Sequence, residues 1–385
     1  MNPMNWPVVY PELWLLVMAC VVLLADLFRP DAERKLTFWL TQFSVGVFAL
    51  LHLADYNAGT TAYGMNGMVV VDPMGRLLAV FAALSIMVTL GYARPTLAAR
   101  DMLKGEFYML TLFVLLGISV MCSANHFLVV YLGLELMSLS LYALCALRRD
   151  HAVATEAAMK FFVLGALASG FLLYGLSMMY GATGSLEIPK VFETIASGRI
   201  NKDVLVFGVV FIVAGLAFKL GAAPFHMWVP DVYQGAPTAV TLLIGAAPKF
   251  AAFAITIRLL VEGLLGLAVD WQQMFIVLAV ASLAVGNIAA IAQSNLKRML
   301  AYSSIAQMGF IVLGLSAGVV SGNTLSAGNA YSSAMFYLVA YVLTTLGTFG
   351  LIMFLSAQGF ESEEIDDLAG LSRRSPWVAG VMTVF

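Results

Sequence analysis

The stretch AFKLGAAPFHMWVPDVYQGAPTAVT, residues 217–241, interrupts an otherwise very apolar chain. A lysine, a histidine, an aspartate and three prolines stand where the flanking sequence would form a continuous membrane helix. Pro224 and Pro230 bracket the residues FHMWV, which predicts that this span is a broken helix. Irregular backbone at membrane depth is tolerated only where it lines a cavity or is buried in protein, and it recurs at ion sites in transporters.

The composition around this stretch identifies lipid as the main solvent. Of the 385 residues, 61% are hydrophobic and 11% are charged, against roughly 45–50% and 25% in soluble domains. The mean hydropathy is +0.92, so an all-α polytopic membrane protein is predicted. The net charge of −2 gives no basic field for nucleic acid. The three cysteines are solitary and have no histidine at metal-ligand spacing, so we expect no disulfide, metal or haem site.

Windows of about 20 apolar residues divide the chain into eleven crossings. They lie near 11–28, 36–54, 74–93, 107–122, 126–147, 155–180, 204–222 with a continuation at 226–238, 239–260, 271–292, 298–318 and 330–357. A twelfth begins at Pro376, but the apolar residues up to Phe385 are too few to cross. We therefore expect the natural protein to continue beyond them.

Lysine and arginine are distributed unevenly over the loops between these spans. With the N-terminus outside, the inner loops hold twelve of them: Arg29, Arg34, Lys35, Arg94, Arg100, Lys104, Arg148, Arg149, Lys297, Arg298, Arg373 and Arg374. The outer side holds five: Arg76, Lys190, Arg199, Lys202 and Arg258. The positive-inside rule therefore predicts an external N-terminus. In the loops, we expect the acidic run 361–367 to be a solvated connector and Ile188–Ile195 to lie as an amphipathic helix on the outer surface.

Three lysines remain inside predicted spans, namely Lys160, Lys219 and Lys249. A lysine in mid-helix costs about 2.5–3.5 kcal/mol on insertion scales, so each needs a physical reason. Glu135 also lies in a span and has no lysine within a turn on its own helix. We therefore expect Glu135 and Lys219 to pair between helices and to couple their protonation.

The other polar residues of the spans suggest a path. Glu156 and Lys160 are spaced i, i+4 in the favourable order, which fits either an interfacial ion pair or a proton uptake site. Pro248 removes an amide beside Lys249, so the carbonyl of Ile244 is free to accept from water or an ammonium. His226 stands beside the predicted break. A purely structural alternative stays open, in which Glu135 and Lys219 only join two helices.

GLEL with Glu135, AAMKFF with Lys160, the stretch 217–241 and APKFAAF with Lys249 together resemble the proton-translocating, antiporter-like subunits of respiratory complex I. NLKRMLAYSSIAQMG (295–309) extends the likeness over nearly the whole chain. The segments PELWLLVMACVVLLADLF (11–28) and LELMSLSLYAL (134–144) resemble one branch of that family most. Its sister branches and the large subunits of cation/proton antiporters share the broken helix and are the main alternatives.

The resemblance implies an organisation and a function. Residues 1–106 would form three N-terminal helices, 107–260 a first inverted five-helix repeat with a break near 222–231, and 271–385 a second, incomplete repeat. The chain would sit in the bacterial inner membrane beside other complex I subunits, with subunits K and M as neighbours. NADH, FMN, iron–sulfur clusters and quinone would act elsewhere in the complex, and this chain would bind none of them. Protons would pass along Glu156, Lys160, Lys219, His226 and Lys249, with Glu135 tuning Lys219; a non-pumping structural subunit is the further alternative.

Overall fold

The structure is a computed structural model that describes residues 4–29, 33–198, 202–320, 323–356 and 363–384. In chain order the elements are η1 (Trp6–Val9), α1 (Tyr10–Phe28), α2 (Lys35–Ala58), β1 (Ala62–Gly64), η2 (Met65–Gly67), β2 (Val69–Val71), α3 (Pro73–Ala98), α4 (Gly105–Cys122), α5 (Phe127–Cys145), α6 (Ala152–Thr183), α7 (Ile188–Ala196), α8 (Lys202–Leu220), α9 (Trp228–Gly235), α10 (Thr238–Gly245), α11 (Ala247–Thr256), η3 (Ile257–Gly263), η4 (Leu265–Leu267), α12 (Ala268–Ile291), α13 (Leu296–Ser316), α14 (Ala327–Leu355), η5 (Ile365–Leu368), α15 (Leu371–Arg374) and α16 (Pro376–Val384).

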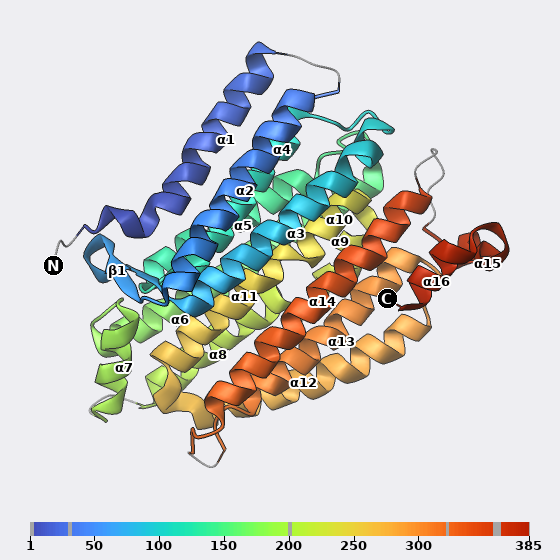
Figure 1. Cartoon of the computed structure of the whole chain (residues 1–385). Coiled ribbons are helices and arrows are strands. Elements are labelled where there is room, and N and C mark those ends of the chain that lie inside the picture. Colours follow the sequence, from blue (N-terminus) through green and yellow to red (C-terminus); the bar gives the residue numbers. More distant parts are fainter. Residues whose placement is uncertain (1–3, 30–32, 199–201, 321–322, 357–362, 385) are drawn as a thin grey trace.

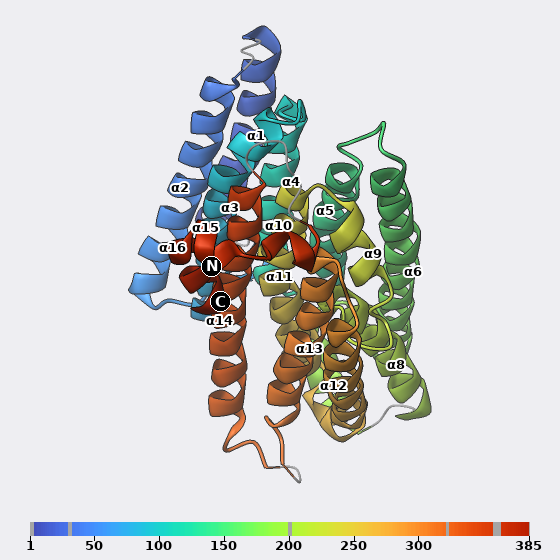
Figure 2. The same cartoon turned by 90° about the vertical axis from the view of Figure 1, so that its right-hand side faces the viewer.

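Within the described ranges, eleven segments are long and apolar enough to cross a membrane, and they coincide with the eleven predicted spans. Figure 1 shows the long helices running side by side, with α1 and α2 at one edge of the bundle and α12, α13 and α14 at the other. In Figure 2, α10 and α11 lie near the middle of the bundle, and α9 lies to their right, toward α6 and α8. The antiparallel hairpin of β1 and β2, which the sequence did not predict, lies in the connection between α2 and α3.

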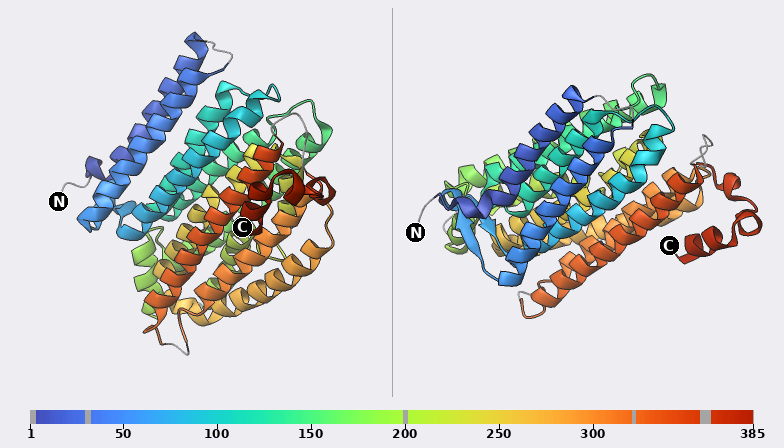
Figure 3. Two further views of the ribbon diagram at one scale, coloured as in Figure 1. Left: turned by 45° about the vertical axis from the view of Figure 1, so that its right-hand side comes forward. Right: turned by 45° about the horizontal axis from the view of Figure 1, so that its top comes forward.

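The loops gather at two ends of the bundle, as alternating crossings require. Figure 3 places α15, α16 and the C-terminus at the end opposite to β1 and the N-terminus. At the α15 end, Arg34 donates to the carbonyl of Leu103, and a cavity of about 300 Å³ is lined by Arg100, Arg148 and Lys297. The loops predicted to be rich in Lys and Arg therefore meet at one end of the bundle.

Small residues allow close packing of three helix pairs. A Cβ atom on Gly117 of α4 would lie 2.6 Å from the Met137 nitrogen of α5. The equivalent distance is 2.7 Å from Gly175 of α6 to the Gly208 oxygen of α8, and 2.6 Å from Gly286 of α12 to the Ala306 nitrogen of α13. Such contacts replace the hydrophobic driving force that lipid does not provide between helices.

The break predicted near 222–231 is present but begins and ends earlier. Helix α8 ends at Leu220, Gly221 adopts φ +82°, and α9 begins at Trp228. Pro230 therefore belongs to the first turn of α9, where its missing amide leaves no hydrogen bond unmade. A second interruption follows at Ala246 (φ −106°, ψ −91°), so the span predicted at 239–260 is divided into α10 and α11.

Two predictions about the loops have different outcomes. The amphipathic stretch at Ile188–Ile195 forms α7, as expected. The acidic run is exposed at residues 364–366, as a solvated connector requires. Glu363 differs, because it forms an ion pair of 2.6 Å with the buried Lys297 and its carbonyl accepts from the Leu296 amide. A buried ammonium at the start of α13 needs a counterion, and the run supplies it. Residues 361 and 362 of this run lie outside the described residues.

Candidate functional site: two lysines at a broken helix

Lys219 lies at the C-terminal end of α8, one residue before the break. Its ammonium donates to the Ser138 hydroxyl at 3.0 Å and to the Ser169 hydroxyl at 3.4 Å. In the part of the chain that the structure describes, no ion pair within 4.0 Å joins it to Glu135, and Oε1 of Glu135 is buried without a hydrogen-bond partner. The direct pair expected from the sequence is therefore absent. Ser138 takes its place because it lies one turn along α5 from Glu135 and faces α8.

Lys249 lies in the first turn of α11 and is 2% exposed. Its ammonium donates to the carbonyl of Leu220 at 2.7 Å, and not to Ile244 as the position of Pro248 suggested. The last carbonyls of α8 have no partner within their own helix, so the break itself creates this acceptor. Gly221 suits this position because its backbone is left-handed, a conformation that other residues rarely adopt. A Cβ atom on residue 221 would also lie 3.0 Å from the Val229 side chain and 3.6 Å from Lys249 Nζ.

Both lysines border one space, which we call the lysine cavity. Its volume is about 30 Å³, and its lining includes Lys219, Lys249, Ser138, Phe161 and Trp228. A cavity of this size with polar groups has room for a water molecule. Both lysine side chains therefore border a space that can hold water.

His226 does not line the lysine cavity. It lies within the break, half-buried, and its Nδ1 is buried without a hydrogen-bond partner. Pro224 and Met227, on either side of it, are exposed. The structure thus brings Lys219 and Lys249 together and leaves His226 to one side of them.

Glu156 and Lys160 form the predicted i, i+4 ion pair, at 2.8 Å. Lys160 also contacts Asp231 of α9 at 2.7 Å, and the second Asp231 oxygen contacts Arg298 of α13 at 2.7 Å. Asp231 thus joins three helices through one carboxylate. We call the space of about 160 Å³ beside Glu156, Lys160 and Asp231 the charged cavity.

The sequence reasoning missed several of these groups. Asp231 was visible within the opening stretch and, three residues after Trp228, lies on the same side of α9. Ser138 stands three residues after Glu135, which is the same helical spacing. No spacing in the sequence pointed to Ser169, because its hydrogen bond to Lys219 depends on how α6 packs against α8.

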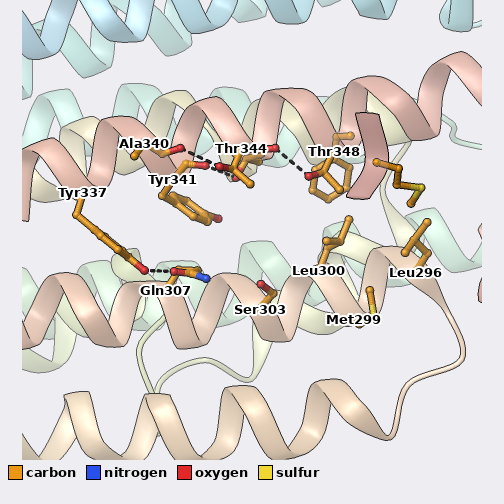
Figure 4. A pocket seen from close by; sticks show the side chains of 13 residues that line it. Leu296, Met299, Leu300, Ser303, Gln307, Tyr337, Ala340, Tyr341, Thr344 and Thr348 are labelled. Atoms are coloured by element: carbon orange, nitrogen blue, oxygen red, sulfur yellow. Dashed lines mark hydrogen bonds between the residues drawn. The ribbon is translucent and has the colours of Figure 1, made fainter. Parts of the chain in front are cut away.

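A separate groove of about 370 Å³ runs between α13 and α14. Figure 4 shows Tyr337 donating to Gln307 from the facing helix, with Ser303 and Tyr341 farther along the same groove. Tyr341 donates to Ser304 at 2.7 Å. The lining of this groove mixes apolar side chains with hydroxyl and amide groups and contains no charged side chain, so it holds none of the six site residues expected from the sequence.

Comparison with known proteins locates the chain in a family. The family model described as "NADH:quinone oxidoreductase/Mrp antiporter, TM" matches residues 124–385. The chain is 62% identical over 384 residues to the NADH-quinone oxidoreductase subunit N of Polaromonas naphthalenivorans, covering 100% of this chain and 77% of that protein. The chain belongs to the NADH-quinone oxidoreductase subunit N family. A second subunit N, from Herminiimonas arsenicoxydans, is 62% identical over 99% of this chain and 78% of its own.

Solved structures agree with membership of the subunit N family. A chain of respiratory complex I from Thermus thermophilus with bound aureothin has 31% identity and a TM-score of 0.73, covering 96% of this chain and 75% of that one. A chain of the Mrp complex from Dietzia sp. DQ12-45-1b has a TM-score of 0.84 at 18% identity, covering 99% and 70%, and shows the same fold only. The chain is thus an antiporter-like, multi-pass membrane subunit of a bacterial complex I.

Proposed function

We propose that this chain moves protons within complex I, with Lys219 and Lys249 as its two central carriers. The observation that supports this is that both ammonium groups border one cavity of about 30 Å³ while neither contacts a carboxylate among the described residues. An unpaired cation is expensive to bury, so it persists where function requires it. Their hydroxyl and carbonyl partners allow a proton to leave without stranding a counterion.

The remaining polar residues supply the two sides of this relay. Glu156 and Lys160 take up protons at the charged cavity, together with Asp231. Glu135 acts on Lys219 through space, because its Oε1 has no hydrogen-bond partner among the described residues and the carboxylate lies within electrostatic reach of the ammonium. His226 stays a candidate carrier beside the break, but the shared cavity gives Lys219 and Lys249 a direct connection that bypasses it.

The setting of this relay follows from the family. Electron transfer from NADH through FMN and iron–sulfur clusters to quinone belongs to other subunits, and its energy reaches this chain through neighbouring membrane subunits, for which K and M are the candidates. The excess of Lys and Arg in the loops at the α15 end favours the inner side for that end and an external N-terminus. Residues 107–260 and 271–385 are the candidates for the two inverted repeats.

The proposal is tested with the complete complex in liposomes, by measuring proton movement per NADH oxidised for Lys219→Ala and Lys249→Ala. Both variants should lose a large part of the proton movement. The matched control is Lys190→Ala, which removes a lysine that is 60% exposed and paired with Glu187 outside the relay. Wild-type proton movement in both relay variants, with normal assembly, would identify a structural subunit. Proton movement that depends on Na⁺ would favour a cation/proton antiporter.

A further inference from the structure

The charged cavity and the lysine cavity approach each other along the seam between α6 and α9. On α6, Ala157 and Lys160 border the charged cavity, whereas Phe161 borders the lysine cavity. On α9, Asp231 and Gln234 border the charged cavity, whereas Trp228 borders the lysine cavity. Phe161 and Trp228 are therefore the residues by which these two helices close the lysine cavity.

The rings of Phe161 and Trp228 are stacked on each other across the seam. Their centroids are 4.7 Å apart with an interplanar angle of 13°, and both side chains are buried. No water fits between rings in face-to-face contact at this distance. The stack therefore excludes water from the place where α6 and α9 face each other beside the lysine cavity.

Trp228 is held in place by Phe218 of α8 and Lys249 of α11. Its indole nitrogen donates to the Phe218 carbonyl at 3.0 Å, and its ring lies 5.5 Å from the Phe218 ring. The ammonium of Lys249 lies 5.9 Å from the indole ring, within the range of a cation–π attraction. The charge on one of the two lysines thus helps to set the position of the indole.

A pump needs such an element, because a continuous water chain from either side would let protons run back down their gradient. We infer that the Phe161–Trp228 stack is the barrier that separates the proton uptake site from the lysine relay. It opens when the indole swings away from Phe161 and closes when Lys249 is charged. This inference rests on the proposed function, since it assigns a gate to the same relay.

The test measures passive proton leak in liposomes that contain the complete complex, with an imposed pH gradient and no NADH. Trp228→Ala should raise the leak several-fold, while NADH–quinone electron transfer continues and proton movement per NADH falls. Phe161→Ala removes the other ring and should give the same result. Trp228→Phe keeps a ring in the stack and should leak little.

Trp271→Ala is the matched control. Trp271 is equally buried, donates to the Leu264 carbonyl at 3.2 Å and packs against Phe275 with centroids 5.6 Å apart, but it lines neither cavity. A complex that assembles with Trp228→Ala or Phe161→Ala and holds the gradient like wild type would overturn the inference. So would an equal leak in Trp271→Ala, which would assign the effect to general loosening.

The two proposals fail in different ways. If Lys219→Ala pumps normally, the relay is wrong, whatever the leak of the Trp228 variant. If Lys219→Ala stops pumping and neither ring variant leaks, the relay stands and the barrier is wrong. Phe161→Leu is the fallback if neither Trp228→Ala nor Phe161→Ala assembles, because leucine keeps most of the side-chain volume without the ring. This variant should still leak more protons than wild type. A Phe161→Leu complex that leaks no more than wild type would count against the barrier.

Discussion

Arg258 and Lys249 are two buried basic side chains on one membrane span, and their hydrogen-bond partners differ in number and charge. Arg258 is 1% exposed and contacts Asp72 at 2.6 Å, Glu262 at 2.8 Å and the Cys122 carbonyl at 2.9 Å. Lys249 is 2% exposed, and the Leu220 carbonyl is its one hydrogen-bond partner among the described residues. The Arg258 guanidinium joins the N-cap of α3, the end of α4 and η3, whereas the Lys249 ammonium donates only to a backbone carbonyl at the break among the described residues. Pairing with two carboxylates is typical of a structural cation, whereas a buried cation without a carboxylate is a candidate for function.

The largest effect on stability is expected at the paired cation. Arg258→Met leaves the Asp72 and Glu262 carboxylates without their counterion, and breaking a buried pair costs about 3–5 kcal/mol. The lower end applies, because the Glu262 side chain is 37% exposed. The amount of chain in assembled complex should fall strongly, as measured by native gel analysis of membranes. Normal assembly of Arg258→Met would contradict the structural role.

At the unpaired cation, function rather than stability should be lost. Lys249→Met removes a charge that costs about 2.5–3.5 kcal/mol to insert, and it leaves the Leu220 carbonyl without a partner, at a cost of about 1–3 kcal/mol. These terms nearly cancel, so the complex should assemble while proton movement per NADH falls. Failure of Lys249→Met to assemble would remove the contrast with Arg258.

A finer distinction concerns Glu135, whose Oε1 is buried without a hydrogen-bond partner among the described residues. Glu135→Asp retains the carboxylate and should keep more of the coupled proton movement than Glu135→Ala, because its effect on Lys219 is electrostatic. Both variants are compared with wild type in the same liposomes. An equal loss in the two would point to packing of α5 instead.

The smallest effect on stability is expected at the charged cavity. Asp231 and its partners are partly exposed, with side-chain exposures of 31% for Asp231 and 43% for Lys160. Exposed ion pairs contribute about 0–1 kcal/mol, so Asp231→Asn should assemble normally. A thermal-shift double-mutant cycle with Arg298→Gln should give a coupling below about 1 kcal/mol. A much larger coupling would place Asp231 with the structural pairs, beside Arg258.

Much of the fold could be predicted from the amino-acid pattern. All eleven spans were located, because lipid demands a long apolar run for every crossing. The pair of Glu156 and Lys160 was also predicted, since both residues lie on one helix with a known spacing. The start of the break was predicted to within a few residues. Its end was placed too late, because Pro230 is compatible with the first turn of α9.

Contacts between helices could not be predicted in the same way. Lys219 was expected to meet Glu135 and instead meets Ser138 and Ser169, because hydrogen-bond geometry between helices depends on their rotation and depth. The docking of Glu363 on Lys297 joins residues far apart in the chain and has no local signal.

The sequence by itself determined a polytopic membrane chain with a broken helix and three lysines inside its spans, because apolar runs, prolines and charges act through local rules. Only the tertiary structure decided that Lys219 and Lys249 share one cavity, that Asp231 joins three helices and that the rings of Phe161 and Trp228 stack between α6 and α9. These features arise where helices from distant parts of the chain meet. Their distances depend on packing, which a periodic pattern does not encode.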